Sequence, residues 1–255
     1  MSRPAPRHSR SHRHRTPRTA RYVFYTLLGV VGEILITISL ILGLFIFWQL
    51  YWTSWEVEGV REAAVSQFHD SIEPPTQGTG EIRTDDPPPF EKVGNGETIG
   101  VLHVRKWGMQ IPIVEGTDQY LLDQAFAGHY PNTQQAGEVG NFVIAAHRRS
   151  YGNNFRHIDT MEPGERLVVE TKDAWIVYEV AKSEIVLDTA TEVTYPVPHE
   201  RGATATERLM TMTTCSTATG GQFGNSHRFI LYSKFQYWMP RDSGTPEEIA
   251  DEGAE

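Results

Sequence analysis

RLMTMTTC at residues 208–215 and RFILY at residues 228–232 are the most informative stretches of this chain. Both are short runs rich in apolar and β-branched residues, and such runs predict strands. The first run ends on Cys215, the only cysteine in the sequence, and the second begins at Arg228. A cysteine with no partner in its own chain is either a small buried hydrophobe or a reactive thiol.

Further runs of the same kind predict a domain made mainly of β-strands. The predicted strands span residues 99–104, 109–114, 141–146, 165–170, 174–180, 184–186, 208–213 and 228–234. Only two short helices are predicted, over residues 119–126 and 154–160. Many short strands and few helices within about 140 residues predict a closed or nearly closed barrel, because closure removes exposed strand edges.

Charge is distributed very unevenly along the chain. Of the 23 lysines and arginines, seven lie within residues 1–21, which carry no acid. The remainder therefore carries 16 basic against 32 acidic side chains. A polyanionic body argues against nucleic acid as a partner. Because the arginine-rich segment directly precedes an apolar run, it is interpreted as a cytoplasmic flank of a membrane span.

Residues 22–52 predict a single membrane anchor. Glu33 is the only charge in this segment, and the 19 residues of 34–52 carry none. As a helix, that uncharged stretch is about 28 Å long, which matches a bilayer core. It exceeds the apolar region of a cleaved signal peptide. We therefore expect an uncleaved single-pass anchor in the cell membrane, with the N-terminus in the cytoplasm and the β-domain outside the cell.

Composition divides the chain into five predicted regions. Residues 54–68 predict a helical stalk, and residues 71–95 are rich in Pro, Gly, Thr and Asp and predict an extended linker. The tail from residue 240 is acidic and predicted to be disordered. The predicted regions are a basic cytoplasmic tail (1–21), the anchor (22–52), stalk and linker (53–97), the folded domain (98–239) and the tail (240–255).

Cys215, His147 and Arg228 form the candidate catalytic set. A cysteine nucleophile reacts as the thiolate, which a neighbouring base favours. His147 ends the predicted strand at 141–146 and is the candidate base, while Arg228 offers permanent charge and several N–H donors to an oxyanion or a substrate backbone. Strand ends on one rim of a small barrel converge, and the glycine-containing loop 216–227 is predicted to border a substrate groove there.

Each of these residues also has an ordinary structural interpretation. The domain contains five other histidines, and an arginine at a strand end is often simply solvated; the specificity lies in the combination. The other histidines are His103, His129, His157, His199 and His227. The sequence predicts no zinc site, because it has no H-E-x-x-H or C-x-x-C spacing, and it has no G-x-S-x-G serine motif.

These motifs resemble those of the sortases, the membrane-anchored cysteine transpeptidases of Gram-positive bacteria. TMTTC at 211–215, followed by Arg228, resembles the family signature Thr-Leu-X-Thr-Cys with its downstream arginine. Upstream matches are GHYP at 128–131, GEVGN at 137–141, AHR at 146–148, YG at 151–152, Phe155 and PGE at 163–165. The resemblance covers residues 98 to about 234. Met212 replaces the usual leucine and Ala146 a common glycine, and neither change removes a reacting group.

The resemblance implies an eight-stranded sortase-type barrel without a cofactor. It implies that Cys215 attacks the carbonyl after threonine in a Leu-Pro-X-Thr-Gly-like sorting signal, and that an amine from a cell-wall precursor or a pilin lysine resolves the acyl-enzyme. His147 would protonate the leaving amine, and Arg228 would bind the oxyanion or the substrate backbone. Thr214 and Ala146 are the expected substrate contacts. The layout most resembles class E, the actinobacterial housekeeping type, whose signal resembles Leu-Ala-X-Thr-Gly.

Three alternatives remain open from the sequence. A pilin-polymerising class C sortase is one, since DPPPF at 86–90 loosely echoes the lid of that class; the lack of a second apolar segment in residues 235–255 weighs against it. A non-catalytic module that binds peptides at the cell envelope is the second. The third is a cysteine peptidase that uses water as its acceptor, because hydrolysis and transpeptidation share the acyl-enzyme.

Overall fold

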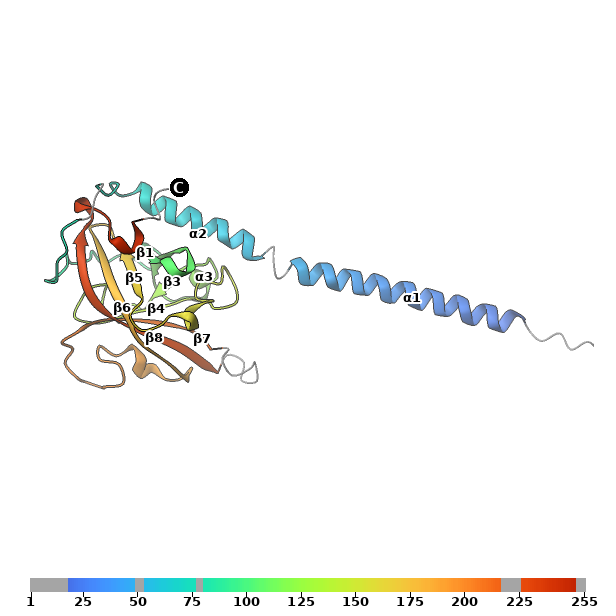
Figure 1. The fold of residues 1–255 in the computed structure, drawn as a ribbon. Helices are drawn as coiled ribbons and strands as arrows, with labels where there is room; N and C mark the ends of the chain where they lie inside the picture. Colours follow the sequence, from blue (N-terminus) through green and yellow to red (C-terminus); the bar gives the residue numbers. More distant parts are fainter. Residues whose placement is uncertain (1–17, 49–52, 77–79, 217–225, 251–255) are drawn as a thin grey trace, which may run out of the picture. The chain divides into compact units, whose positions relative to one another are not determined.

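The computed structural model describes residues 18–48, 53–76, 80–216 and 226–250, which form two compact units, Met1–Tyr51 and Trp52–Glu255. The first unit contains the helix α1, Arg18–Phe47 (Figure 1). Its stretch Arg21–Phe47 is long and apolar enough to cross a membrane, and its most apolar part is not buried within the protein. By length and composition, α1 is therefore a candidate membrane span.

The second unit is built around a closed barrel of eight strands, which confirms the predicted fold class (Figure 1). The strand order around the barrel is β1-β2-β3-β4-β7-β8-β6-β5. The pairs β2–β3 and β4–β7 are parallel and the other six pairs are antiparallel. The strands are β1 Thr98–Val104, β2 Met109–Glu115, β3 Ala127–His129, β4 Gly140–Ala145, β5 Arg166–Glu170, β6 Ala174–Leu187, β7 Arg208–Cys215 and β8 His227–Pro240.

Alternation along the strands builds a core inside the barrel and a second apolar layer outside it. In β6, Ile176 and Tyr178 point into the central cluster, whereas Trp175 and Val177 belong to an outer cluster. Successive side chains of a strand point to opposite faces, so one strand supplies both layers. The outer layer requires a cover, and helix α2 and the C-terminal residues provide it.

Several predicted boundaries change in the structure. The predicted strands 174–180 and 184–186 are one strand, β6, whose register against β8 shifts at two irregular positions. The three-residue strand β3 was not predicted, because it is too short to show alternation. The predicted helix 119–126 is reduced to α3, Gln119–Leu122, and the helix 154–160 to a 3₁₀ turn, Ile158–Thr160. Ala125 has a φ of 61°, a left-handed conformation in which an α-helix cannot continue.

The predicted stalk is instead part of the folded domain. Helix α2, Thr53–Asp70, packs on β1 and β2 (Figure 1). Its side chains Val65 and Phe68 are buried against Val101, which faces outward from β1. The hydrophobic contacts fix α2 to the outer face of the barrel, so it does not act as a free spacer.

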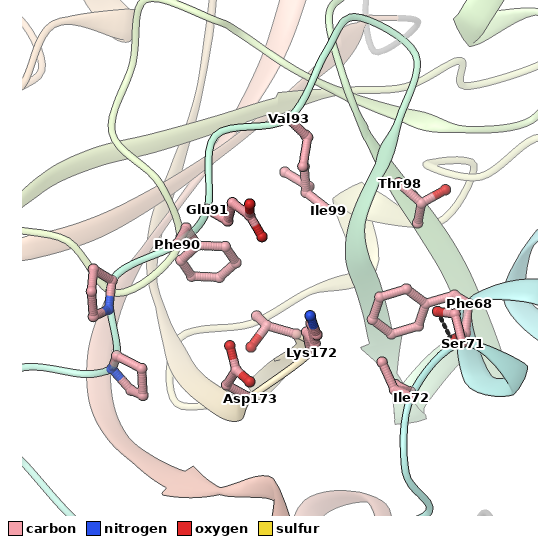
Figure 2. A pocket seen from close by; sticks show the side chains of 13 residues that line it. Phe68, Ser71, Ile72, Phe90, Glu91, Val93, Thr98, Ile99, Lys172 and Asp173 are labelled. Carbon is pink, nitrogen blue, oxygen red and sulfur yellow. Dashed lines mark hydrogen bonds between the residues drawn. The ribbon is translucent and has the colours of Figure 1, made fainter.

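The proline-rich linker is likewise bound to the barrel rather than extended away from it. Arg83 pairs with Trp238 of β8 through two backbone hydrogen bonds of 2.9 and 2.8 Å. Phe90 and Val93 pack against the central cluster. Figure 2 shows them beside Ile99, lining a pocket of about 350 Å³ that also receives Phe68. This pocket lies where β1 begins and β5 ends, which is the end of the barrel opposite Cys215.

The predicted disorder of the tail is wrong for residues 240–250. The segment forms 3₁₀ turns over Arg241–Ser243 and Glu247–Ile249. The Trp175 indole N–H donates to the carbonyl of Gly244 at 3.0 Å, and Ile249 is buried in the outer cluster. Acidic composition suggested disorder, but a few apolar and polar anchors suffice to hold this segment against β6. Residues 251–255 of the predicted tail lie outside the described residues.

A shortened chain that begins at Thr98 is expected to be less stable than one that begins at Thr53. The shorter chain loses the contacts of Val65 and Phe68 with the barrel, and burial of two such side chains contributes roughly 3–6 kcal/mol. Urea unfolding of the two shortened chains and of the full chain in detergent measures the difference. Equal unfolding free energies for all three would show that α2 and the linker contribute nothing to the fold.

Candidate active site

Strand register brings the three predicted catalytic residues to one end of the barrel. Cys215, the last residue of β7, lies opposite Arg228 of β8 in the antiparallel pairing. Strand β4 runs parallel to β7, with Ala145 beside Thr213. The alignment continues past the end of β4, because the Ala146 N–H donates to the Thr213 carbonyl at 3.3 Å. Two residues beyond Ala145, His147 therefore follows β4 onto the rim on which β7 ends at Cys215.

Thr214 fastens the two strands at this rim. Its hydroxyl donates to the carbonyl of Ala146 at 2.7 Å. The side chains of both residues are buried, with only 3% and 4% of each residue exposed. The hydrogen bond therefore joins the ends of β4 and β7 at this rim. Their assignment as substrate contacts stays a prediction.

Cys215 itself is partly exposed, unlike the buried threonine before it. A structural cysteine is most often fully buried, whereas a nucleophile must be reached by its substrate. The segment 217–225, which was predicted to border a substrate groove, lies outside the described residues. The partial exposure of Cys215 therefore supports the reactive interpretation of the thiol, and the groove stays a prediction.

His147 has a carboxylate partner that sequence analysis missed. Its Nε2 atom lies 2.7 Å from Oδ1 of Asp123, and both side chains are only partly exposed, at 19% and 24%. Asp123 caps the C-terminal end of α3, where Gln119 donates to the same oxygen at 2.7 Å. The imidazole also lies tilted against the ring of Tyr151 at a centroid distance of 5.4 Å. The ring thus contacts both a carboxylate and an aromatic side chain.

The contact with Asp123 also decides which imidazole nitrogen is available. A carboxylate accepts hydrogen bonds, so Nε2 of His147 carries the proton in this pair. Nδ1 is then the imidazole nitrogen that does not contact Asp123. An aspartate at the end of a one-turn helix has no sequence signature, and only the fold reveals the pair.

Arg228 lies near Tyr130, which, like Asp123, was not predicted to belong to the site. Burial raises the pKa of the Tyr130 phenol, and the positive charge of Arg228 partly opposes that rise. Tyr130 follows β3, and its backbone N–H donates to Val143 of β4 at 3.0 Å. The rim therefore combines a permanent cation opposite Cys215 with a phenol near that cation, and both present N–H or O–H donors.

Other histidines belong to structural pairs. His129 is fully buried, stacks on Phe142 and donates from Nδ1 to Glu115 at 2.8 Å. His199 contacts Glu184 at 2.6 Å on the outer face of β6. These pairs explain why residue type alone did not distinguish a catalytic histidine.

The Asp123→Asn variant is expected to lower the turnover number by about tenfold with little change in KM for peptide. An amide supports the imidazolium form less well than a carboxylate, and it can hold the wrong tautomer. The effect is limited because the pair is partly solvated. A pH profile of kcat separates loss of a charged partner from loss of structure. Asp118→Asn, at the exposed start of the same helix, is the matched control and should behave as wild type.

A closed β-barrel that gathers a cysteine, a histidine and an arginine at one rim has the layout of a cysteine-dependent acyl-transfer enzyme. Residues 102–236 match the family model for the sortase domain. Sortase SrtE2 of Streptomyces coelicolor is 32% identical over 219 residues, which cover 81% of each chain. Sortase SrtE1 of the same organism is 30% identical over 226 residues, covering 86% of this chain but 60% of its own length. The chain belongs to the sortase family, the cysteine transpeptidases, and its named relatives are of class E.

Solved structures agree with this assignment. SrtA sortase from Actinomyces oris is 51% identical, covers 66% of this chain and 96% of its own, and superposes with a TM-score of 0.63. Sortase E1 from Streptomyces coelicolor, solved with a tripeptide in its active site, is 32% identical, covers 60% of this chain and 97% of its own, and has a TM-score of 0.55. The predicted resemblance to class E is confirmed.

Proposed function

We propose that this chain is a membrane-anchored transpeptidase that cleaves a sorting signal after threonine and transfers the protein to an amine. The observation that carries the proposal is the register of β4, β7 and β8, which brings His147, Cys215 and Arg228 to one rim. The family, its class E relatives and the partly exposed thiol support it.

Catalysis proceeds in two acyl-transfer steps. The Cys215 thiolate attacks the threonine carbonyl, and Arg228 stabilises the negative charge that develops on the carbonyl oxygen. His147 gives a proton to the departing glycine amine, the C–N bond breaks and a thioester remains. An incoming amine then attacks the thioester, His147 takes its proton, and Cys215 leaves as the thiolate. Asp123 holds the imidazole in position throughout.

We propose Leu-Pro-X-Thr-Gly-like or Leu-Ala-X-Thr-Gly-like peptides as the signals and a cell-wall precursor amine as the acceptor. The relatives named as sortase E favour the alanine-containing signal, which the resemblance to class E implies. A pilin lysine is the acceptor in the class C alternative. In that class, a lid precedes the barrel and covers the site.

Packing of the linker does not favour the class C alternative. Asp86, in the segment that resembles the lid, is bound to Arg208 at the start of β7. Arg208 and Cys215 stand at opposite ends of an eight-residue strand, about 23 Å apart. The segment therefore covers the end of the barrel that is remote from the nucleophile.

For localisation, we propose that α1 spans the cell membrane once. Its apolar length fits a bilayer, and the arginine-rich segment before it favours a cytoplasmic N-terminus. The catalytic domain is then extracellular, where sorting signals and cell-wall amines are present.

A product assay with peptide panels tests this function. The full chain in detergent is mixed with Leu-Pro-X-Thr-Gly and Leu-Ala-X-Thr-Gly peptides, with and without a glycine-based amine. Transpeptidation predicts a new amide that grows with amine concentration at the expense of the free acid. Free acid alone, unaffected by amine, would identify a peptidase, and binding without either product would identify a non-catalytic module.

A further inference from the structure

A group of two histidines and a glutamate lies on the barrel's outer face, away from the rim of Cys215, and only the His69 side chain in it is partly exposed, at 36%. His69 comes from α2, His103 from β1 and Glu170 from the end of β5. Nε2 of His69 and Nε2 of His103 lie 2.9 and 2.8 Å from the same oxygen, Oε2 of Glu170. Glu170 is fully buried and His103 is 4% exposed. Three distant parts of the chain thus place their polar atoms at one point.

We propose that His69, His103 and Glu170 bind one zinc ion, which fastens α2 to the barrel. Their ligand atoms all lie within 4.8 Å of one another. Imidazole nitrogen and carboxylate oxygen are ordinary zinc ligands, and three protein ligands leave a fourth position for water. The three ligands are far apart in the sequence, at residues 69, 103 and 170, so they form no short metal-binding motif.

Metal binding requires the three ligand atoms to move to the spacing of a tetrahedral site. Tetrahedral zinc with ligands at roughly 2.0–2.1 Å separates neighbouring ligand atoms by about 3.3 Å. The two N···O separations of 2.9 and 2.8 Å have to widen by about half an ångström, and the two nitrogens, which lie within 4.8 Å of each other, have to reach the same spacing. In the metal-free form, each Nε2–H donates to Glu170. Zinc takes the place of both protons, and each imidazole then carries its proton on Nδ1.

The surroundings leave the required atoms and space available. Arg241 binds Glu170 through the other carboxylate oxygen, Oε1, at 3.0 and 2.7 Å, so Oε2 remains directed at the histidines. A cavity of about 320 Å³ adjoins the group and is lined by Gln110 and Trp175 as well. It offers room for a water as the fourth ligand. The charge of Arg241 opposes the bound cation and limits affinity, which favours a divalent ion of high intrinsic affinity such as zinc.

Zinc titration of the full chain in detergent tests the site. Cys215→Ala serves as the parent, because the thiol is itself a zinc ligand, and His8, His12 and His14 remain as a constant background. Micromolar zinc is expected to raise the unfolding temperature of the parent by several degrees. Equilibrium dialysis should show one more tightly bound zinc in the parent than in His69→Ala or His103→Ala, with an affinity loss of about 100-fold at the site.

Two further variants separate metal binding from folding. His69→Gln keeps an N–H donor for Glu170 and should fold, yet it should show no zinc-dependent stabilisation. His199→Ala is the control. It removes a histidine that pairs with Glu184 outside the proposed site, and this variant should bind zinc as the parent does. If the parent and His69→Gln bind the same number of zinc ions with equal stabilisation, the group is a hydrogen-bonded junction only and the proposal fails.

Discussion

The Cys215→Ala variant is expected to lose acyl transfer by about 10⁴-fold or more while keeping the unfolding transition of the wild type. Alanine supplies no nucleophile, and removal of a nucleophile leaves only the contribution of binding and oxyanion stabilisation. The thiol is partly exposed at the end of β7, so its loss creates little cavity. Peptide cleavage rates and urea unfolding, measured on the same preparation, check both parts.

The matched control for this experiment is His199→Ala, whose imidazole pairs with Glu184 on the outer face of the barrel. Its cleavage rate should equal that of the wild type. Full activity in Cys215→Ala would mean that another residue attacks the substrate, and the proposed mechanism would be wrong. A folded but inactive variant would support the Cys215 thiol as the nucleophile of the wild type.

The second large effect concerns stability. The Glu170→Gln variant is expected to lower the free energy of unfolding by about 3–5 kcal/mol, because it leaves the buried Arg241 without its counter-charge. The same carboxylate accepts hydrogen bonds from α2, β1 and the C-terminal segment. The substitution therefore weakens the contacts of all three segments with β5. Urea unfolding with a metal chelator measures this loss in the absence of zinc.

Glu184→Gln is the matched control for that measurement. Glu184 also accepts from a histidine and a tyrosine, His199 and Tyr232, but its side chain and that of His199 are about a third exposed. Solvent screens such a pair, and its loss should cost less than about 1 kcal/mol. Equal losses of unfolding free energy in the two variants would show that the buried contacts of Glu170 stabilise the fold no more than the exposed contacts of Glu184.

The pKa of Glu170 also predicts how stability depends on pH. Its pKa is about 2 in the folded protein against the usual 4.5. A lowered pKa stabilises the folded state above 4.5, and this contribution is lost as the pH falls from 4.5 towards 2. Unfolding free energies of the wild type should therefore decline through this window more steeply than those of Glu170→Gln. Parallel curves for the two proteins would contradict the assignment.

Sequence patterns sufficed for most of the barrel. Strands β1, β2, β4, β5 and β7 each begin and end within two residues of their predicted limits, because each contains an apolar or β-branched run. The pattern could not show that β6 continues through residues 181–183, where both faces become exposed. Nor could it show three-residue β3, whose parallel pairing with β2 depends on distant residues.

Contacts between distant segments explain the remaining errors. Composition identified residues 53–97 and 240–255 as spacer and disordered tail, since both are polar and contain proline or glycine. In the structure, the outward-facing apolar residues of β1 and β6 bind α2 and the tail. Whether a segment covers the outer face of the barrel depends on tertiary contacts, and local composition does not predict those contacts.

At the rim of Cys215, sequence motifs identified three residues whose catalytic roles stay predictions, and they gave no sign of the side chains that contact those residues. Cys215, His147 and Arg228 stand in recognisable motifs at strand ends. Asp123 was missed because its only signal is contact with His147 across 24 positions. Thr214 was expected to contact substrate, and that stays a prediction; in the structure its hydroxyl donates to the carbonyl of Ala146.

Intact-mass analysis of the acyl-enzyme tests whether Cys215 is the nucleophile. The full chain is mixed with a Leu-Ala-X-Thr-Gly or Leu-Pro-X-Thr-Gly peptide, with and without a competing amine, then quenched in acid and analysed by mass spectrometry. We expect a mass gain equal to the threonyl fragment, located on Cys215 and discharged to an amide when the amine is present. No mass gain from a folded chain with a titratable thiol, or the same gain in Cys215→Ala, would contradict it.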